Sequence, residues 1–178
     1  MKLKNIHQEI PVNVTAEEMW KVLSHYGDVS SFHAGVEESY HVDGSINEAG
    51  MGCERVCNII DMGLHIQLKE RITELEEGKG YRYEVYEWKN FPIQKMFFGF
   101  SILQDEQAKT WLRIDIDYRA NPALLTPLMA WKMKKLAFDV LLGYKHHTET
   151  GEKKVPIKLL RKKYKQEGHQ VLAQAQMS

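Results

Sequence analysis

Residues 51–75 read MGCERVCNIIDMGLHIQLKERITEL, and Met62 with Gly63 can form a tight turn in the middle of this stretch. Strand side chains alternate between the two faces of a sheet, and directly opposed residues touch. With this turn, the more apolar face pairs Ile59 with Ile66, Cys57 with Leu68, Arg55 with Glu70 and Cys53 with Ile72. The other face pairs Asn58 with Gln67, Val56 with Lys69 and Glu54 with Arg71. The stretch therefore predicts a half-buried antiparallel hairpin with a solvated second face.

Arg55 and Glu70 occupy positions at which this pattern predicts apolar side chains. Charged side chains are almost never buried unless they are paired. The two residues are therefore expected to meet each other, a ligand, or water in a cavity. A structural ion pair between the strands and a ligand-binding role are both compatible with the sequence.

The composition is that of an ordinary globular protein. The 178 residues fit one domain, with 43% hydrophobic and 27% charged side chains. The formal net charge of zero argues against a nucleic-acid partner. No apolar run is long enough to cross a membrane, and the first residues lack the apolar core of a signal peptide. We expect a cytoplasmic protein.

The two cysteines, Cys53 and Cys57, lie four residues apart on one predicted strand. That spacing corresponds to about 13 Å at the rise of a strand, which is too far for a disulfide. The eight histidines show no spacing typical of a zinc site. We therefore predict no metal and no cofactor.

The rest of the chain predicts further strands and short helices. A strand over 2–10 ends at Pro11, and a capping box of Thr15 and Glu18 opens a helix. A second short helix is expected over 28–32. Six strands are then expected over 36–42, 51–60, 64–75, 81–88, 94–103 and 110–118, separated by turn residues.

A long helix is predicted near the C-terminus. It begins at Asn121-Pro122 or Thr126-Pro127, both of which suit a helix start, and runs to about Thr150, where Gly151 ends it. An apolar stripe holds Met129, Met133, Ala137, Val140 and Tyr144, and the opposite side holds Lys132, Lys135, Asp139 and His146. Trp20 and Trp131 are interpreted as packing residues.

The chain beyond Gly151 differs in charge. Residues 152–178 carry seven Lys and Arg side chains against two acidic ones, whereas the whole chain is neutral. Within them, Ile157, Leu160 and Tyr164 fall on one side of a basic segment, so that it would suit peripheral contact with an anionic membrane or docking on a partner. A solvated extension is the alternative. We therefore divide the chain into a ligand-binding domain, 1–151, and a basic C-terminal extension, 152–178.

One strand, two short helices, six strands and a long helix is the element order of an α+β helix-grip fold. In that fold a curved antiparallel seven-stranded sheet surrounds a long C-terminal helix. Over residues 3–151 the chain resembles the START-like superfamily, also called SRPBCC or birch-pollen-allergen-like. Within it, the likeness is to the polyketide cyclase/dehydrase and lipid-transport family. The residues that carry the resemblance are 10–11, 16–23, 26–32, 52–55, 68–72, 81–83 and 142–151.

The resemblance implies an elongated cavity for a lipid, hormone or polyketide between the sheet and the long helix. The inward residues, expected to bind the ligand, are Arg55, Cys57, Ile59, Ile66, Leu68, Glu70, Tyr83, Val85, Phe98, Phe100, Ile114, Ile116, Met133, Ala137 and Val140. Residues 52–55 and 70–72 also resemble two motifs of the plant abscisic acid receptors, whose glutamate joins a polar ligand network. This likeness implies that Glu70 orients the ligand. The proline-containing gate loop of those receptors is absent.

We expect the protein to bind or transport an apolar small molecule or lipid in this cavity. A polyketide cyclase/dehydrase-type enzyme acting on a ligand in the same cavity is the alternative, and a protein-interaction module with an incidental cavity is a third. For an enzyme, His33 and His41 are candidate bases near the cavity rim, although both also suit a surface loop. Tyr83, Tyr118 and Tyr144 are candidate hydrogen-bond donors.

Overall fold

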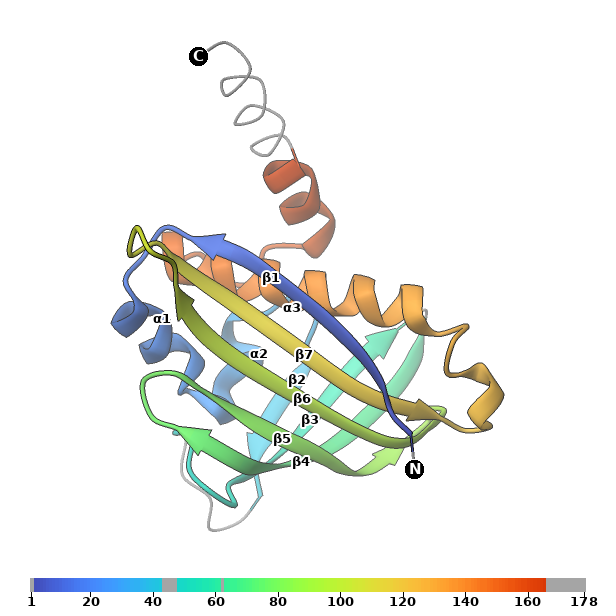
Figure 1. Ribbon diagram of the computed structural model, residues 1–178. Helices are drawn as coiled ribbons and strands as arrows, with labels where there is room; N and C mark the ends of the chain where they lie inside the picture. The colour runs from blue at the N-terminus through green and yellow to red at the C-terminus, as the bar shows by residue number, and fades with distance from the viewer. Residues whose placement is uncertain (1, 43–47, 62, 166–178) are drawn as a thin grey trace.

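The computed structural model describes residues 2–42, 48–61 and 63–165 of the chain (Figure 1). The elements are β1 (Lys4–Val12), α1 (Ala16–Leu23), the 3-10 helix η1 (Tyr26–Asp28), α2 (Val29–Phe32), β2 (Glu38–His41), β3 (Glu54–Asp61), β4 (Leu64–Glu76), β5 (Gly80–Lys89), β6 (Ile93–Gln104), β7 (Thr110–Ala120), the 3-10 helix η2 (Ala123–Leu125) and α3 (Ala130–Thr150). This order confirms the predicted succession of one strand, short helices, six strands and a long helix.

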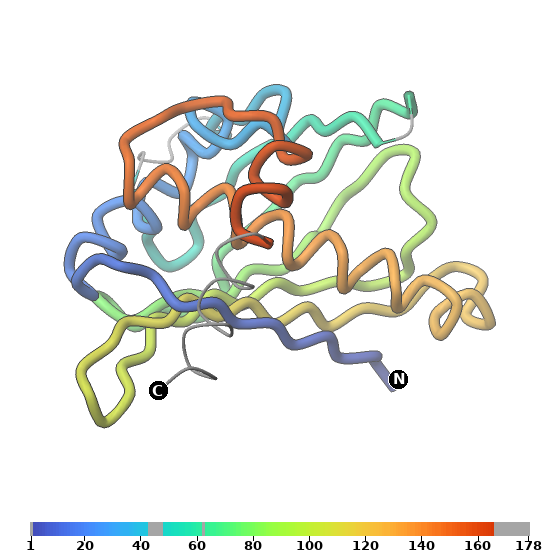
Figure 2. Tube along the Cα trace, turned by 90° about the horizontal axis from the view of Figure 1, so that it is seen from above, coloured from blue at the N-terminus to red at the C-terminus, as the bar shows by residue number. Residues whose placement is uncertain are grey.

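The seven strands form one antiparallel sheet in the order β1-β7-β6-β5-β4-β3-β2. The sheet curves around α3, which lies across its concave face, while α1 and α2 close one end (Figure 1). Seen from above, α3 runs between β1 on one side and the β3–β4 hairpin on the other (Figure 2). The α+β helix-grip fold is therefore confirmed.

The β3–β4 hairpin has the predicted register. Arg55 lies opposite Glu70, Cys57 opposite Leu68 and Ile59 opposite Ile66, and the pairs on the second face also match. Gly63 has a φ of +82°, which glycine adopts without strain, whereas Met62 lies outside the described residues. One detail differs from the expectation of a solvated second face, because Val56 on that face is buried.

Pro11 does not end the first strand, as the sequence suggested. It lies inside β1, opposite Trp111 of β7. Because β1 is an edge strand, its missing N–H need not face a partner strand. The Pro11 carbonyl instead accepts a hydrogen bond from Lys145 Nζ at 2.9 Å, which ties the sheet edge to α3.

The long helix starts later than either proline pair predicted. Thr126 does not cap it, because its hydroxyl accepts the N–H of Ala120 and its carbonyl accepts the Tyr118 hydroxyl. The segment 121–129 contains η2, and α3 begins only at Ala130. Its end is as predicted, since Gly151 adopts a φ of +74° and its N–H bonds the His147 carbonyl.

The C-terminal extension packs on the domain as far as residue 165. Residues 157–165 are helical, and Leu160 is buried in the core, with Val155, Ile157 and Tyr164 packed against it. The sequence placed His146 on the exposed side of α3. The structure buries it, and its two ring nitrogens form hydrogen bonds with Tyr164 and Glu152 of the extension. The domain boundary at Gly151 stays a prediction, and these contacts cross it.

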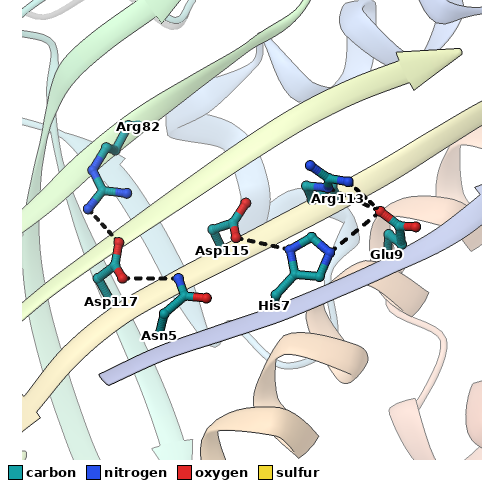
Figure 3. A network of polar contacts seen from close by, with 7 residues as sticks. All are labelled: Asn5, His7, Glu9, Arg82, Arg113, Asp115 and Asp117. Atoms are coloured by element: carbon teal, nitrogen blue, oxygen red, sulfur yellow. Dashed lines mark hydrogen bonds and ion pairs between the residues drawn. The ribbon is translucent and has the colours of Figure 1, made fainter. Parts of the chain in front are cut away.

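The outer face of the sheet carries a polar network. Figure 3 shows its members, which come from β1, β5 and β7: Asn5, His7, Glu9, Arg82, Arg113, Asp115 and Asp117. Arg82 pairs with Asp117 at 2.7 Å and Arg113 with Glu9 at 2.8 Å. The network lies on the solvent-facing side of the sheet, and the core lies on the concave side.

Among the described helices, none is long and apolar enough to cross a membrane.

A chain shortened to end at Gly151 should still unfold cooperatively, because the sheet and α3 are complete by then. We expect its free energy of unfolding to fall by about 2–5 kcal/mol relative to the full chain, since the burial of Leu160 and its neighbours is lost. Urea denaturation of the full and the shortened chain measures this, and equal stability for the two would contradict the packing role of the extension.

Candidate functional site

A cavity of about 470 Å³ lies between α3 and the concave face of the sheet. Its walls come from β3, β4, β5 and β6, from α2 and the residues after it, and from α3. The helical part of the extension adds Ile157 and Arg161. The cavity therefore has four kinds of wall: sheet, long helix, short helix and extension.

Most of the predicted ligand-binding residues line this cavity. These are Arg55, Cys57, Ile59, Leu68, Glu70, Tyr83, Phe98, Phe100, Met133 and Val140. The remaining five do not line it: Ile66, Val85, Ile114, Ile116 and Ala137 are buried in the surrounding core. A strand pattern identifies inward side chains, but it does not tell which of them pack on α3 and which border open space. Whether the lining residues bind a ligand stays a prediction.

Arg55 and Glu70 form a buried ion pair in the cavity wall. Each residue is only 3% exposed, and Arg55 Nε lies 2.5 Å from Glu70 Oε2. The same oxygen accepts the Cys57 thiol at 3.7 Å. The other oxygen, Glu70 Oε1, has no hydrogen-bond partner among the described residues. The pair thus leaves one acceptor of a charged group unused in the cavity wall.

Two further contacts hold the guanidinium of Arg55. Arg55 Nη1 donates to the carbonyl of Tyr26 at 2.5 Å, so η1 is tied to β3. The guanidinium carbon lies 4.0 Å from the centre of the Tyr26 ring and 5.0 Å from that of Tyr83, within the range of cation–π contacts. The role of Tyr26 was missed from the sequence, because nothing in its local pattern indicates a contact 29 residues away.

The strand pairing also changes at Glu70. Lys69 lies opposite Glu87 while Glu70 lies opposite Val85, so that Tyr86 is an extra residue on β5. Such a bulge bends a sheet and increases its twist. Glu70 therefore sits where the sheet curls toward α3.

Aromatic rings surround the ion pair. Tyr26 meets Tyr81 edge-on at 5.5 Å, and Tyr83 stacks on Phe98 at 5.2 Å. Burial raises the pKa of Tyr26 and Tyr83 well above the usual value of a phenol, and raises the pKa of the Cys57 thiol. These side chains are therefore neutral near pH 7, and the Tyr26 hydroxyl lacks a hydrogen-bond partner among the described residues.

His33 lines the cavity, but it is not the rim base that the sequence suggested. Its ring is 3% exposed, and burial lowers its pKa to about 4. Nδ1 accepts the N–H of Gly35 at 3.0 Å, so Nε2 carries the proton of the neutral ring. A Cβ at Gly143 would lie 2.1 Å from the imidazole, so only glycine lets α3 approach it. His41 lies outside the cavity lining, against Gly27.

At the other end the cavity reaches the surface, beside the tip of the β3–β4 hairpin and the first turns of α3. Trp131 borders it with 69% of its surface exposed, which corrects its interpretation as a packing residue. Lys132 pairs with Asp61 across this mouth. Arg161 of the extension pairs with Asp139 through two hydrogen bonds, one of 2.5 Å from Nε. The sequence placed Arg161 in the basic C-terminal extension, and no local signal indicated its pairing with α3.

A second hollow, of about 620 Å³, lies on the outer face of the sheet. Although it is larger, its charged lining residues already pair with one another, as in Arg82 with Asp117 and Lys79 with Glu76. Its lining mixes these paired charges with apolar side chains such as Leu75, Ile102 and Leu103. Among the described residues, no three His, Cys, Asp or Glu side chains lie close enough together to hold a metal ion. The inner cavity is therefore the candidate site.

Comparisons with known proteins agree with this geometry. The sequence profile of the family described as "Polyketide cyclase / dehydrase and lipid transport" matches residues 4–143. No curated protein sequence matches the chain significantly.

Solved structures share the fold at low sequence identity. The structure of Ara h 8.0201 is 13% identical with a TM-score of 0.66, and the match covers 82% of this chain and 97% of that one. The Zhui aromatase/cyclase from Streptomyces sp. R1128 is 13% identical with a TM-score of 0.65, covering 83% and 94%. A START superfamily protein from Mycobacterium smegmatis is 13% identical with a TM-score of 0.60, covering 80% and 97%. At this identity the likeness shows the fold alone.

Replacing Glu70 with Gln should lower the free energy of unfolding by about 3–5 kcal/mol, because it leaves a buried guanidinium without a counter-charge. Glu74→Gln on the same strand is the matched control, since the Glu74 side chain is 74% exposed and lies 3.8 Å from Arg82. We expect the control to change stability by less than about 0.5 kcal/mol. Equal denaturant midpoints for the two variants would contradict a filled, desolvated pair.

The stability should also depend on pH through His33. Its pKa in the folded protein, about 4, is below the value of about 6.5 in the unfolded chain, so the unfolded state binds more protons between these values. Stability is therefore lost as pH falls, by about 2 kcal/mol between pH 7.5 and pH 5. His33→Asn should lack this component. Denaturant titrations of both proteins at the two pH values measure it, and identical pH dependences would show that the ring is not desolvated.

Proposed function

The chain belongs to the polyketide cyclase/dehydrase and lipid transport family, and we propose that it binds an apolar small molecule or lipid in the cavity between α3 and the sheet. The polar group of the ligand faces Glu70 and Arg55, and its apolar part extends toward the mouth at Trp131. The observation that carries this proposal is the free oxygen Glu70 Oε1 in an otherwise largely apolar cavity wall. A charged acceptor that faces a cavity without a protein partner favours a ligand that donates a hydrogen bond to it.

The size of the cavity supports a small-molecule ligand. Its volume of about 470 Å³ falls within the range of about 300–1,000 Å³ typical of ligand pockets. The apolar lining from Leu68, Phe98 and Val140 suits an alkyl chain or fused rings. Such a site buries most of the ligand and fixes its orientation through a few polar groups.

The charges at the ion pair indicate which polar group fits. Glu70 Oε1 accepts hydrogen bonds, while Arg55 uses two of its five N–H donors on Glu70 and the Tyr26 carbonyl. A ligand hydroxyl can both donate to Glu70 and accept from Arg55, whereas a ligand carboxylate can only accept and would place a second negative charge beside Glu70. We therefore infer that an alcohol or phenol binds better than a carboxylate of the same carbon skeleton.

The alternative is a cyclase/dehydrase-type enzyme whose substrate binds in the same cavity. The Zhui aromatase/cyclase shares the fold. The pKa shifts favour binding over proton transfer. Burial raises the pKa of Tyr83 and Tyr144 and lowers the pKa of His33. The pKa values of these lining residues therefore lie outside the range that is useful for acid–base catalysis at neutral pH. Catalysis stays a hypothesis without a residue assigned to it.

An environment-sensitive dye should bind the intact protein with micromolar affinity, about −8 kcal/mol, and a long-chain alcohol should displace it. Val140→Trp should weaken dye binding at least tenfold, because Val140 lines the cavity and an indole fills part of it. Phe138→Trp is the matched control, since Phe138 lies on the outer side of the same helix and is 37% exposed.

Displacement of the bound dye by an alcohol and by the carboxylate of equal chain length tests which polar group the site at Glu70 prefers. We expect the alcohol to displace the dye at a lower concentration. Binding that is unchanged in Val140→Trp, or a preference for the carboxylate, would contradict the proposed position of the ligand or its orientation, respectively.

A further inference from the structure

Five large apolar side chains are exposed at one end of the molecule. Leu124 and Trp131 are each 69% exposed, and Leu128 is 64% exposed; Leu124 and Leu128 lie between β7 and α3, and Trp131 lies in the first turn of α3. Ile60 and Leu64, at the tip of the β3–β4 hairpin, are 50% and 48% exposed. We call these five residues the mouth surface, because both Ile60 and Trp131 also line the opening of the cavity.

Both parts of the mouth surface lie at the same end of the molecule (Figures 1 and 2). The ion pair between Lys132 and Asp61 joins the first turn of α3 to the hairpin tip. Four more large apolar side chains among the described residues are exposed, Tyr40, Met51, Phe138 and Leu159, but they do not belong to this surface. Exposed apolar area is therefore concentrated where the cavity opens.

The charges at this end are mainly positive. Eight basic side chains lie at this end of the molecule. They come from the starts of β1, β4 and β6, from the ends of β3, β5 and β7, and from residues 121–136. They are Lys2, Lys4, Lys89, Lys95, Arg119, Lys132, Lys134 and Lys135. Asp61 and Glu87 lie in the same described segments, and Glu84 of β5 pairs with Lys95 at 3.3 Å, so basic side chains still outnumber the acidic ones here. Because the whole chain is neutral, this end is a distinct basic pole.

We propose that the mouth surface docks on an anionic lipid membrane. Trp and Leu side chains insert into the interface between headgroups and acyl chains, while lysines at their edge attract anionic headgroups. Lys134 and Lys135 lie three and four residues after Trp131, so they neighbour it on the surface of α3 and place basic groups beside the exposed indole. Docking in this orientation directs the cavity opening toward the lipid.

The same observations argue against the C-terminal extension as the main contact. Its apolar side chains Ile157, Leu160 and Tyr164 pack on the domain, so they are not available to a membrane. Leu159 is its one described large apolar side chain with high exposure, at 57%. Membrane contact through the lysines of the extension stays a prediction, and Leu159 supplies a matched control for the mouth surface.

The test uses the full-length protein and cosedimentation with two kinds of vesicle, phosphatidylcholine alone and phosphatidylcholine mixed with phosphatidylglycerol. We expect binding to the mixed vesicles only, and weaker binding at high salt. Trp131→Glu and Leu128→Glu should each weaken it at least tenfold. Lys134→Gln and Lys135→Gln should each weaken it about fivefold. Leu159→Glu, which introduces the same charge at another exposed apolar residue, should leave it unchanged.

The fluorescence of Trp131 gives a second test of whether this side chain enters the membrane. Of the four tryptophans it alone is highly exposed, so brominated lipids should quench its fluorescence in the wild type and quench much less in Trp131→Phe.

Three outcomes would overturn the proposal: no binding to the mixed vesicles, loss of binding in Leu159→Glu but not in Trp131→Glu, or a Trp131-dependent dimer in sedimentation velocity without vesicle binding. Val140→Trp should still bind vesicles, since it fills the cavity and leaves the mouth surface intact. The result is therefore independent of whether the cavity holds a ligand.

Discussion

The ion pair between Arg55 and Glu70 joins β3 to β4 beneath the cavity, and the site depends on its burial. Removing both charges from water costs several kcal/mol for each ion, which only close pairing and further hydrogen bonds can offset. Arg55 finds these in Glu70 and the Tyr26 carbonyl. Glu70 finds them in Arg55 and Cys57, but only through Oε2. The pair therefore fixes η1 against the sheet and leaves one polar atom for a ligand.

The walls of the cavity follow from how α3 is held away from part of the sheet. Lys145 attaches the C-terminal half of α3 to Pro11 of the edge strand β1, and His33 packs on the same half at Gly143. The N-terminal half meets the hairpin tip through the ion pair of Lys132 and Asp61. Between these attachments the facing side chains border open space. The extension, held by Leu160 and Arg161, adds a wall beside α3.

The sequence predicted much of this arrangement, because strand pairing is a local rule. The turn at residues 62–63 sets the register of Arg55 and Glu70, and the capping box and Gly151 set the ends of two helices. Contacts between distant segments were not predictable in this way. The Tyr26 carbonyl, the packing of Leu160 and the exposure of Trp131 depend on how three elements meet in space. The division between core residues such as Ala137 and lining residues such as Val140 depends on the same geometry.

The central claim is that the cavity holds one apolar molecule whose polar end faces Glu70. Native mass spectrometry of the freshly purified full-length protein tests this most directly, with a long-chain alcohol added where no molecule co-purifies. We expect a complex of one small molecule per chain, which disappears on denaturation and is absent from the Val140→Trp variant. The bare protein mass under all of these conditions, or an equal complex in Val140→Trp, would contradict it.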